Sequence, residues 1–177
     1  MIRKIGEGKY NCLSEFKMAE INKYLIAKIR NESFGININS VQEIIRDVEV
    51  SKVPGKIEYL EGVISVRNSV IPLINLKLKL FGDTRKNDEL IVVIAHDKEG
   101  ENHIGFTVDE VVEVISIPDN MIDNPLFFSN KYGDNVVSGI GKLDSGLVVI
   151  LNIDKLMTPE DMTDIESALK RKRKTSK

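Results

Sequence analysis

The sequence has very little cysteine, histidine and tryptophan, and this scarcity excludes several kinds of site. The single cysteine, Cys12, cannot form an intramolecular disulfide, and two histidines give no cluster with metal-ligand spacing. The amino terminus, with Gly6, Glu7 and Lys9, lacks the apolar stretch of a signal peptide, and no window approaches the roughly 18 consecutive apolar residues of a membrane span. We therefore expect a soluble cytoplasmic protein in a reducing compartment, with no metal, no cofactor and no membrane insertion.

A strong charge of one sign is also missing, since 25 Lys and Arg residues stand against 27 Asp and Glu residues, for a formal net charge of -2. Such a chain has no overall attraction to nucleic acid or anionic membranes. A barrel that binds single-stranded nucleic acid requires aromatic residues that alternate with Lys or Arg. Aromatic residues make up 6% of this chain, and no strand-like run shows that alternation. A small-barrel nucleic-acid-binding or other interaction module stays the alternative function. The basic run at residues 170–174 either contacts anionic lipid or nucleic acid or is a solvated tail.

The groups that an enzyme needs cannot be assembled from this sequence. His96 and His103 flank a predicted hairpin turn, where exposed histidines are ordinary, and residues 139–141 lack the third glycine and the following helix of a dinucleotide site. The acidic pair at residues 109–110 is most simply a turn. We predict that the protein is not an enzyme and has no catalytic residues.

The chain does contain many short runs rich in Ile and Val, separated by turn signals. These signals are Asn31-Glu32, Pro54-Gly55, Asn68-Ser69, residues 97–100 and residues 144–146. No helical pattern of ten or more residues occurs before the end of the chain. At 177 residues with 42% hydrophobic content, the chain is long enough to bury a core, and we predict a mainly β domain.

Two local patterns follow each other early in the domain. Phe34, Ile36 and Ile38 alternate with small or polar residues, which predicts a strand with these three side chains on its core face. Ser40 and Glu43 have the spacing of a capping box, which predicts one short helical turn over residues 41–45.

The two ends of the chain differ from the middle. Residues 1–17 are polar and aperiodic, which indicates a flexible extension, and the native start is either Met1 or Met18. Near the other end, Thr158 is placed to cap a helix. Apolar residues follow it at helical spacing, namely Met162, Ile165 and Leu169. We predict that residues 158–177 form a helix, which docks on the body, and a basic tail.

The sequence also resembles itself. Residues 62–75 resemble residues 139–152 at an offset of 77, and both read as strand, tight polar turn, strand. Residues 34–44 resemble residues 104–114 at an offset of 70. This order indicates two similar units, about 33–76 and 104–153. Closing each small sheet into a barrel removes its exposed edges, so we expect two small barrels that pack together.

Five segments in order also resemble the CheW family, across about residues 20–157. They are Val41–Ile44, Gly62–Arg67, Val70–Leu76, Gly105–Val111 and Leu151–Leu156. The resemblance implies a CheW-like domain over residues 18–157, built as two intertwined five-stranded SH3-like β-barrel subdomains, with a short C-terminal helix. The same module occurs in the kinase CheA and in CheV, but only a helix and a tail follow it here, so this chain resembles the free-standing adaptor.

By that resemblance the protein is a non-enzymatic adaptor that couples chemoreceptors to the histidine kinase CheA in bacterial chemotaxis. The implied partners are the regulatory domain of CheA, the cytoplasmic tip of methyl-accepting chemoreceptors, and other CheW-like proteins in rings. The implied location is the cytoplasm, at receptor arrays next to the inner membrane.

The family match also implies which residues contact the kinase. These positions are Leu25, Ile38 and Val41. The alternative is that all three are core residues, and for Ile38 the shared strand face with Phe34 and Ile36 favours the core.

For the receptor the match implies a second set of positions. They are Glu43, Arg67, Gly105, Val111 and Val114. The forked guanidinium of Arg67 suits a carboxylate or helix-end carbonyls on a partner, and the alternative is a solvated arginine. Glu43 is otherwise a capping residue, and Val111 and Val114 are otherwise barrel core. The family usually has glycine after the motif arginine, and Asn68 is the next-best residue for a left-handed turn.

Overall fold

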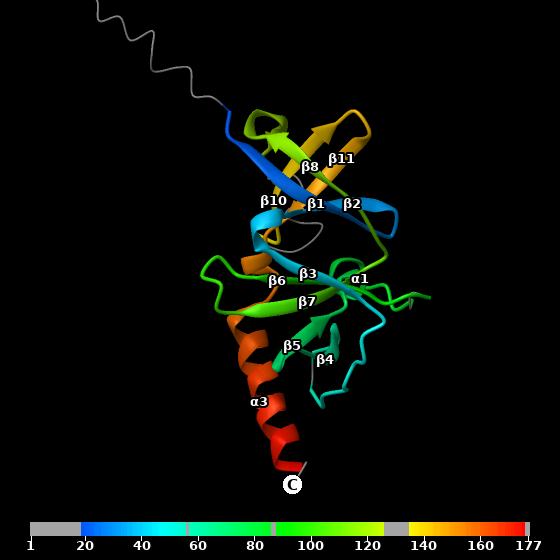
Figure 1. Ribbon diagram of the computed structural model, residues 1–177, viewed down its shortest axis with the longest axis vertical. Coiled ribbons are helices and arrows are strands. Elements are labelled where there is room, and N and C mark those ends of the chain that lie inside the picture. Colours follow the sequence, from blue (N-terminus) through cyan, green and yellow to red (C-terminus); the bar gives the residue numbers. More distant parts are fainter. Residues whose placement is uncertain (1–18, 56, 86–87, 126–134, 176–177) are drawn as a thin grey trace, which may run out of the picture.

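A computed structural model describes residues 19–55, 57–85, 88–125 and 135–175, and the predicted amino-terminal extension lies outside these ranges. The strands are β1 (Ile21–Ile29), β2 (Glu32–Asn37), β3 (Val41–Arg46), β4 (Leu60–Val66), β5 (Ser69–Ile74), β6 (Ile91–His96), β7 (His103–Val108), β8 (Glu110–Pro118), β9 (Ile122–Asp123), β10 (Val137–Leu143) and β11 (Gly146–Leu151). The helices are α1 (Leu76–Phe81), α3 (Pro159–Thr175) and the short 3-10 turns η1 (Ile38–Ser40), η2 (Asp119–Met121) and η4 (Ile153–Lys155). The fold is mainly β, as predicted (Figure 1).

The strands form two sheets whose orders correspond. Sheet A has the order β8-β1-β2-β11-β10-β9, and sheet B has the order β3-β6-β7-β5-β4. The sequence offsets relate β2 to β7, β3 to β8, and the hairpin β4–β5 to the hairpin β10–β11. Each similar segment therefore gives strands to both sheets, because β2 lies in sheet A while β3 lies in sheet B. This exchange is the intertwined arrangement that the fold prediction described.

Each sheet curls toward a barrel, but its ladder of hydrogen bonds is not continuous. In sheet B the chain after β3 returns to β4, where Ser51 and Val63 exchange two backbone hydrogen bonds of 2.9 Å. In sheet A the chain after β8 returns as β9 and pairs with β10. Gly62 and Gly139, which are related by the offset of 77, lie at these returns. A Cβ at Gly62 would collide with the carbonyl oxygen of Ser51, and one at Gly139 would lie 2.5 Å from Ile122.

The largest hydrophobic cluster lies between the sheets. Alternate residues of each strand face it, so that Leu25 and Ala27 of β1 belong to this central core while Tyr24 and Ile26 belong to the interior of the sheet A barrel. Phe34, Phe106 and Leu76 are fully buried in the central core. Because both sheets contribute to one core, the two barrels cannot separate without exposing it.

One local prediction was wrong. Residues 41–46 are strand β3, not a helical turn, and Ile38 starts the 3-10 turn η1 in place of continuing strand β2. The side chain of Asn37 caps this turn by accepting a hydrogen bond of 2.9 Å from the amide of Asn39. The backbone of β3 then pairs with β6 from Val41 to Arg46, and this long-range ladder prevails over the local capping-box pattern.

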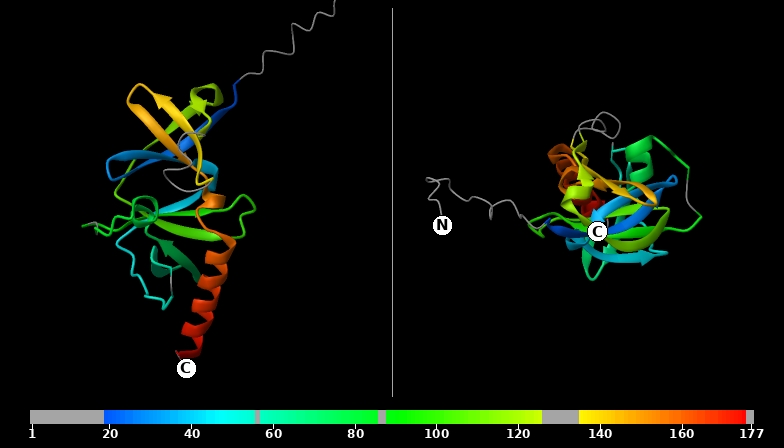
Figure 2. Two further views of the ribbon diagram at one scale, coloured as in Figure 1. Left: turned by 180° about the vertical axis from the view of Figure 1, so that it is seen from behind. Right: turned by 90° about the horizontal axis from the view of Figure 1, so that it is seen from above.

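The predicted C-terminal helix is present as α3, but it continues to Thr175 and so includes the basic run that the prediction assigned to a tail. The Thr158 hydroxyl accepts from the Asp161 amide at 3.1 Å, and the Asp161 carboxylate accepts from the Thr158 amide at 2.9 Å, which is a reciprocal capping box. Ile165 and Ala168 are buried, and Ile165 belongs to the central core. Figures 1 and 2 show α3 running past sheet B to the end of the molecule opposite the β10–β11 hairpin. No described helix is long and apolar enough to cross a membrane.

A buried polar contact fixes the start of α3 to the body. Burial raises the pKa of Asp161, but hydrogen bonds from Tyr59 and Thr158 outweigh burial and hold this pKa below its ordinary value. The Lys79 ammonium lies 3.7 Å from the centre of the Tyr59 ring and 4.0 Å from Asp161. Asp161 is therefore stabilised as a carboxylate.

Candidate functional site

The clearest polar feature at the surface of sheet B is the contact between Glu43 and Arg67. Arg67 and Asn68 have φ angles of 47° and 68°, and such consecutive left-handed residues form the tight turn between β4 and β5. This turn brings Arg67 Nη2 to 3.4 Å from Glu43 Oε2 on β3. Since β3 and β4 are the opposite edges of sheet B, the contact spans the seam where the barrel closes.

This ion pair leaves the Arg67 side chain largely accessible, whereas the Glu43 side chain is largely covered. The Arg67 side chain is 75% exposed, and that of Glu43 is 21% exposed. A long contact of this kind contributes at most about 1 kcal/mol to stability, because water screens it. Within the described residues, Glu43 Oε1 is buried without a hydrogen-bond partner. The group of this pair that a partner can reach is therefore the Arg67 guanidinium.

Exposed aliphatic side chains occur on both sheets, and some of them lie on edge strands. Ile44 on β3 is 41% exposed, and Val114, its equivalent on β8 at the offset of 70, is 48% exposed. Val70, three residues beyond Arg67, is 47% exposed. Exposed apolar groups on edge strands are typical of surfaces that bind other proteins.

The structure separates the residues predicted for kinase binding by burial. Leu25 is 3% exposed and belongs to the central core, whereas Ile38 and Val41 are half-buried and pack against the rim of that core. Leu25 lies directly opposite Val114 and Ile36 in the ladder of sheet A. Leu25 therefore supports neighbouring strands and is itself covered.

The predicted receptor residues do not form a single cluster. Glu43 and Arg67 are in contact, and Val114 is exposed, but Val111 is half-buried against the central core. Gly105 is buried, and a Cβ there would lie 3.2 to 3.4 Å from side chains of three interior residues. Gly105 therefore permits close packing inside sheet B.

Sequence reasoning missed several exposed apolar residues. They are Ile21, Ile44, Val70, Val112, Met121 and Leu147. A signal for two of them was present, because Val70 and Leu147 occupy equivalent positions beside the turns of the two similar hairpins.

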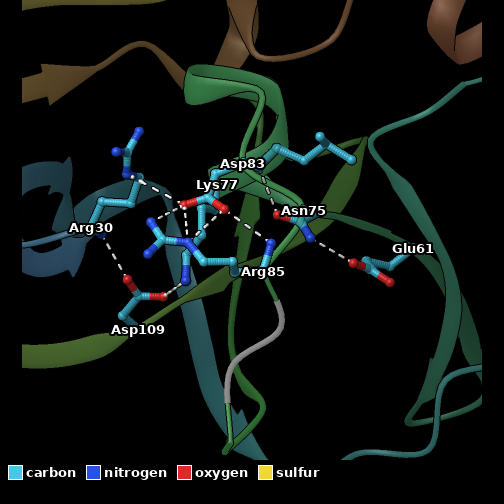
Figure 3. A network of polar contacts seen from close by, with 8 residues as sticks. Arg30, Glu61, Asn75, Lys77, Asp83, Arg85 and Asp109 are labelled. Carbon is cyan, nitrogen blue, oxygen red and sulfur yellow. Dashed lines mark hydrogen bonds and ion pairs between the residues drawn. The ribbon is translucent and has the colours of Figure 1, made fainter.

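A network of ion pairs joins the two barrels beside α1. Lys77 Nζ lies 2.8 Å from Asp109 Oδ1, and the backbone amide of Arg30, in the β1–β2 turn of sheet A, donates to Asp109 Oδ2 at 2.7 Å. Arg30 Nε also lies 3.4 Å from Asp83, which holds Arg85 at 2.6 Å (Figure 3). Hydrogen bonds from Arg85 hold the pKa of Asp83 well below its usual range. The network fixes sheet A to α1 of sheet B.

Comparisons with known proteins agree with this geometry. The family model described as CheW-like domain matches residues 23–160, which include strands of both sheets. A chemotaxis protein CheW of Thermotoga maritima is 30% identical over 150 residues, covering 83% of this chain and 91% of the relative. One of Klebsiella aerogenes is 28% identical over 148 residues, covering 84% and 89%. The crystal structure of the scaffolding protein TtCheW from Thermoanaerobacter tengcongensis matches with a TM-score of 0.70 at 29% identity, covering 76% of this chain and 90% of that one.

Proposed function

Because the chain belongs to the CheW-like domain family, we propose that it is a cytoplasmic chemotaxis adaptor that couples chemoreceptors to the histidine kinase CheA. The relatives are named as chemotaxis proteins, and one solved relative is named as a scaffolding protein. The structural observation that carries the proposal is the Glu43–Arg67 pair, in which a largely covered carboxylate on β3 holds a mostly exposed guanidinium in the β4–β5 turn.

The proposed receptor face is centred on Arg67. Its guanidinium donates to a carboxylate or to helix-end carbonyls of the receptor tip, while Glu43 orients this guanidinium through the 3.4 Å contact at its Oε2. Val114 and Val111 supply apolar contact on β8. Gly105 acts indirectly, since it keeps the packing of sheet B on which the face rests.

The proposed kinase face uses Ile38 and Val41, which are half-buried at the rim of the central core. Leu25 acts from beneath, because it holds the strands that flank it in register. The regulatory domain of CheA carries a similar module, so apolar contact between two such barrels is the interaction we propose. Other CheW-like proteins then bind in rings through the same kind of contact.

The test is a titration of the protein against a CheA regulatory domain and a receptor-tip fragment from the same organism. Arg67→Ala is compared with Arg46→Ala, because Arg46 is also an exposed arginine of this barrel, at the end of β3, where it pairs with Glu89. We expect Arg67→Ala to weaken receptor binding about tenfold or more while kinase binding persists, since the exposed fork supplies charge-assisted hydrogen bonds. We expect Arg46→Ala to bind both the receptor fragment and the kinase domain as the wild type does.

Two results would overturn parts of the proposal. If the folded wild-type protein binds neither partner, the coupling function is wrong. If it binds both and Arg67→Ala changes receptor binding no more than Arg46→Ala does, the function holds but the receptor face lies elsewhere.

A further inference from the structure

The structure has two pockets at equivalent places in its two halves. The sheet A pocket has a volume of about 350 Å³, and the sheet B pocket about 160 Å³. Asn152 lines the first and Asn75 the second, and these residues are related by the offset of 77. Asn37 and Thr107, related by the offset of 70, line them in the same way. The two pockets are therefore formed by equivalent residues of the two similar units.

The polar side chains of the sheet B pocket form hydrogen bonds and ion pairs with other residues of the protein. Asn75 accepts from the Leu78 amide at the start of α1 and donates to Glu61 at 2.6 Å. Lys77 lines the pocket with a side chain only 12% exposed, and its ammonium pairs with Asp109 (Figure 3). The Lys77 ammonium thus supplies a positive charge in this pocket, where oxygen atoms accept its hydrogen bonds.

No described residue that lines the sheet A pocket places a buried cation in it. The 3-10 turn η4 follows Asn152 where helix α1 follows Asn75, and the Asn152 side chain caps nothing. Asp154 occupies the position that Lys77 has in the other half. In the described part of the chain, the side chains of Asn39, Ser40 and Asn152 line the pocket without a hydrogen bond to the protein. These groups are available to a ligand.

The charged groups of the sheet A pocket favour a cation. Among the described residues that line the pocket, Asp97 and Asp154 carry carboxylates and Lys98 carries an ammonium. Lys98 is 84% exposed, and its Nζ lies 3.7 Å from Asp154. A hydrogen bond from Asn102 lowers the pKa of Asp97, although partial burial opposes it, so that this carboxyl stays ionised. His96 Nδ1 lies 2.7 Å from the Asp97 carbonyl oxygen, which can only accept, so Nδ1 donates this hydrogen bond.

We propose that the sheet A pocket binds a guanidinium or ammonium group, in the place that Lys77 fills in the sheet B pocket. Such a group donates hydrogen bonds to Asp154, to the amide oxygens of Asn39 and Asn152, and to Ser40. The volume is within the range of about 300–1,000 Å³ that ligand sites have. The cation belongs either to an arginine or lysine side chain of a partner protein or to a free small amine.

The direct test is a titration of the ¹⁵N-labelled protein with N-acetyl-arginine amide, followed by amide chemical shifts. N-acetyl-citrulline amide is the matched control ligand, because its side chain has the same shape without the charge. We expect shifts around residues 37–40 and 151–154, with an affinity of about 1 mM, for the arginine compound alone. Agmatine and N-acetyl-lysine amide form two further arms. Tighter binding of agmatine indicates a free amine, and tighter binding of the capped residues indicates a protein side chain.

Two variants and a control test the assignment. Asp154→Asn removes the charge but keeps an acceptor for the Lys98 amide, and we expect about three- to fivefold weaker binding. Asp154→Lys reproduces the sheet B arrangement and abolishes binding. Asp123→Asn, which removes an exposed carboxylate of β9, leaves binding unchanged.

Thermal unfolding first shows that each variant is folded. Equal response to the arginine and citrulline compounds, shifts outside the pocket, or unchanged binding by folded Asp154→Lys would each refute the proposed site. Binding to CheA or a receptor is not needed for any of these outcomes.

Discussion

The backbone return that closes sheet B predicts a large effect of a single methyl group at Gly62. Gly62 has a φ of 149°, and an added Cβ would collide with the Ser51 carbonyl oxygen. A non-glycine residue in such a conformation costs about 1–3 kcal/mol. The collision also disrupts the two hydrogen bonds between Ser51 and Val63, each worth about 0.5–1.5 kcal/mol. We expect Gly62→Ala to lower the free energy of unfolding by about 2–6 kcal/mol.

Substitutions at two other glycines separate the cost of the backbone conformation from the cost of the collision. Gly146 has a φ of 126° but open space around its Cβ position, so Gly146→Ala introduces backbone strain without a collision. Gly55 has open space and no such φ, so Gly55→Ala changes stability within about 1 kcal/mol. Urea unfolding of the three variants should give the largest loss for Gly62, then Gly146, then Gly55. Equal losses at Gly62 and Gly146 would refute the role of the closing contact.

Three further predictions concern a cap, a carboxylate and the core. Asn75→Ala should lower the free energy of unfolding by about 1–2 kcal/mol, because it removes the cap of α1, whereas Asn152→Ala, which removes no cap, should leave urea stability nearly unchanged. Because the pKa of Asp161 is lowered in the folded protein, its stabilising contribution is complete above about pH 4 and is lost as the pH falls toward the lowered pKa. Urea midpoints between pH 6 and pH 3 should therefore fall less for Asp161→Asn than for the wild type, and parallel curves would contradict this. Leu25→Ala should cost about 2–5 kcal/mol in unfolding free energy and Val114→Ala about 0.5 kcal/mol, and the reverse order would mean that their burial is wrong.

The sequence predicted the mainly β fold because that signal is repeated along the chain. Short Ile- and Val-rich runs between turn residues recur, and Phe34 and Ile36 are buried on one face as their alternation predicted. The start of the final helix was also predictable, since Thr158 and Pro159 carry a local signal. The comparisons confirm the resemblance to the CheW family and with it the prediction that the chain is not an enzyme.

The errors arose where distant contacts decide the local structure. Ser40 and Glu43 have capping-box spacing, but pairing of β3 with β6 makes this segment a strand and Glu43 contacts Arg67 instead. Helix α1 was missed because six residues are too short to show periodicity, although Asn75 and Gly82 cap its two ends.

The candidate site was only partly accessible to sequence reasoning. The resemblance indicated Glu43 and Arg67 separately, but their contact depends on the curvature of sheet B, which no local pattern encodes. The burial of Leu25 and the exposure of Val114, which are direct neighbours in the ladder, depend equally on where the edge of sheet A lies. The roles of these residues in binding stay predictions.

The most direct test of the central claim is whether one molecule of this protein holds both partners at once. Sedimentation velocity of the protein mixed with a CheA regulatory domain and a receptor-tip fragment distinguishes a three-component complex from pairs. If the kinase and receptor faces are separate, a ternary complex forms when both partners are saturating. With the Arg67→Ala variant, the complex then contains less receptor fragment. Mutual displacement of the two partners, with only binary complexes at every ratio, would contradict the account.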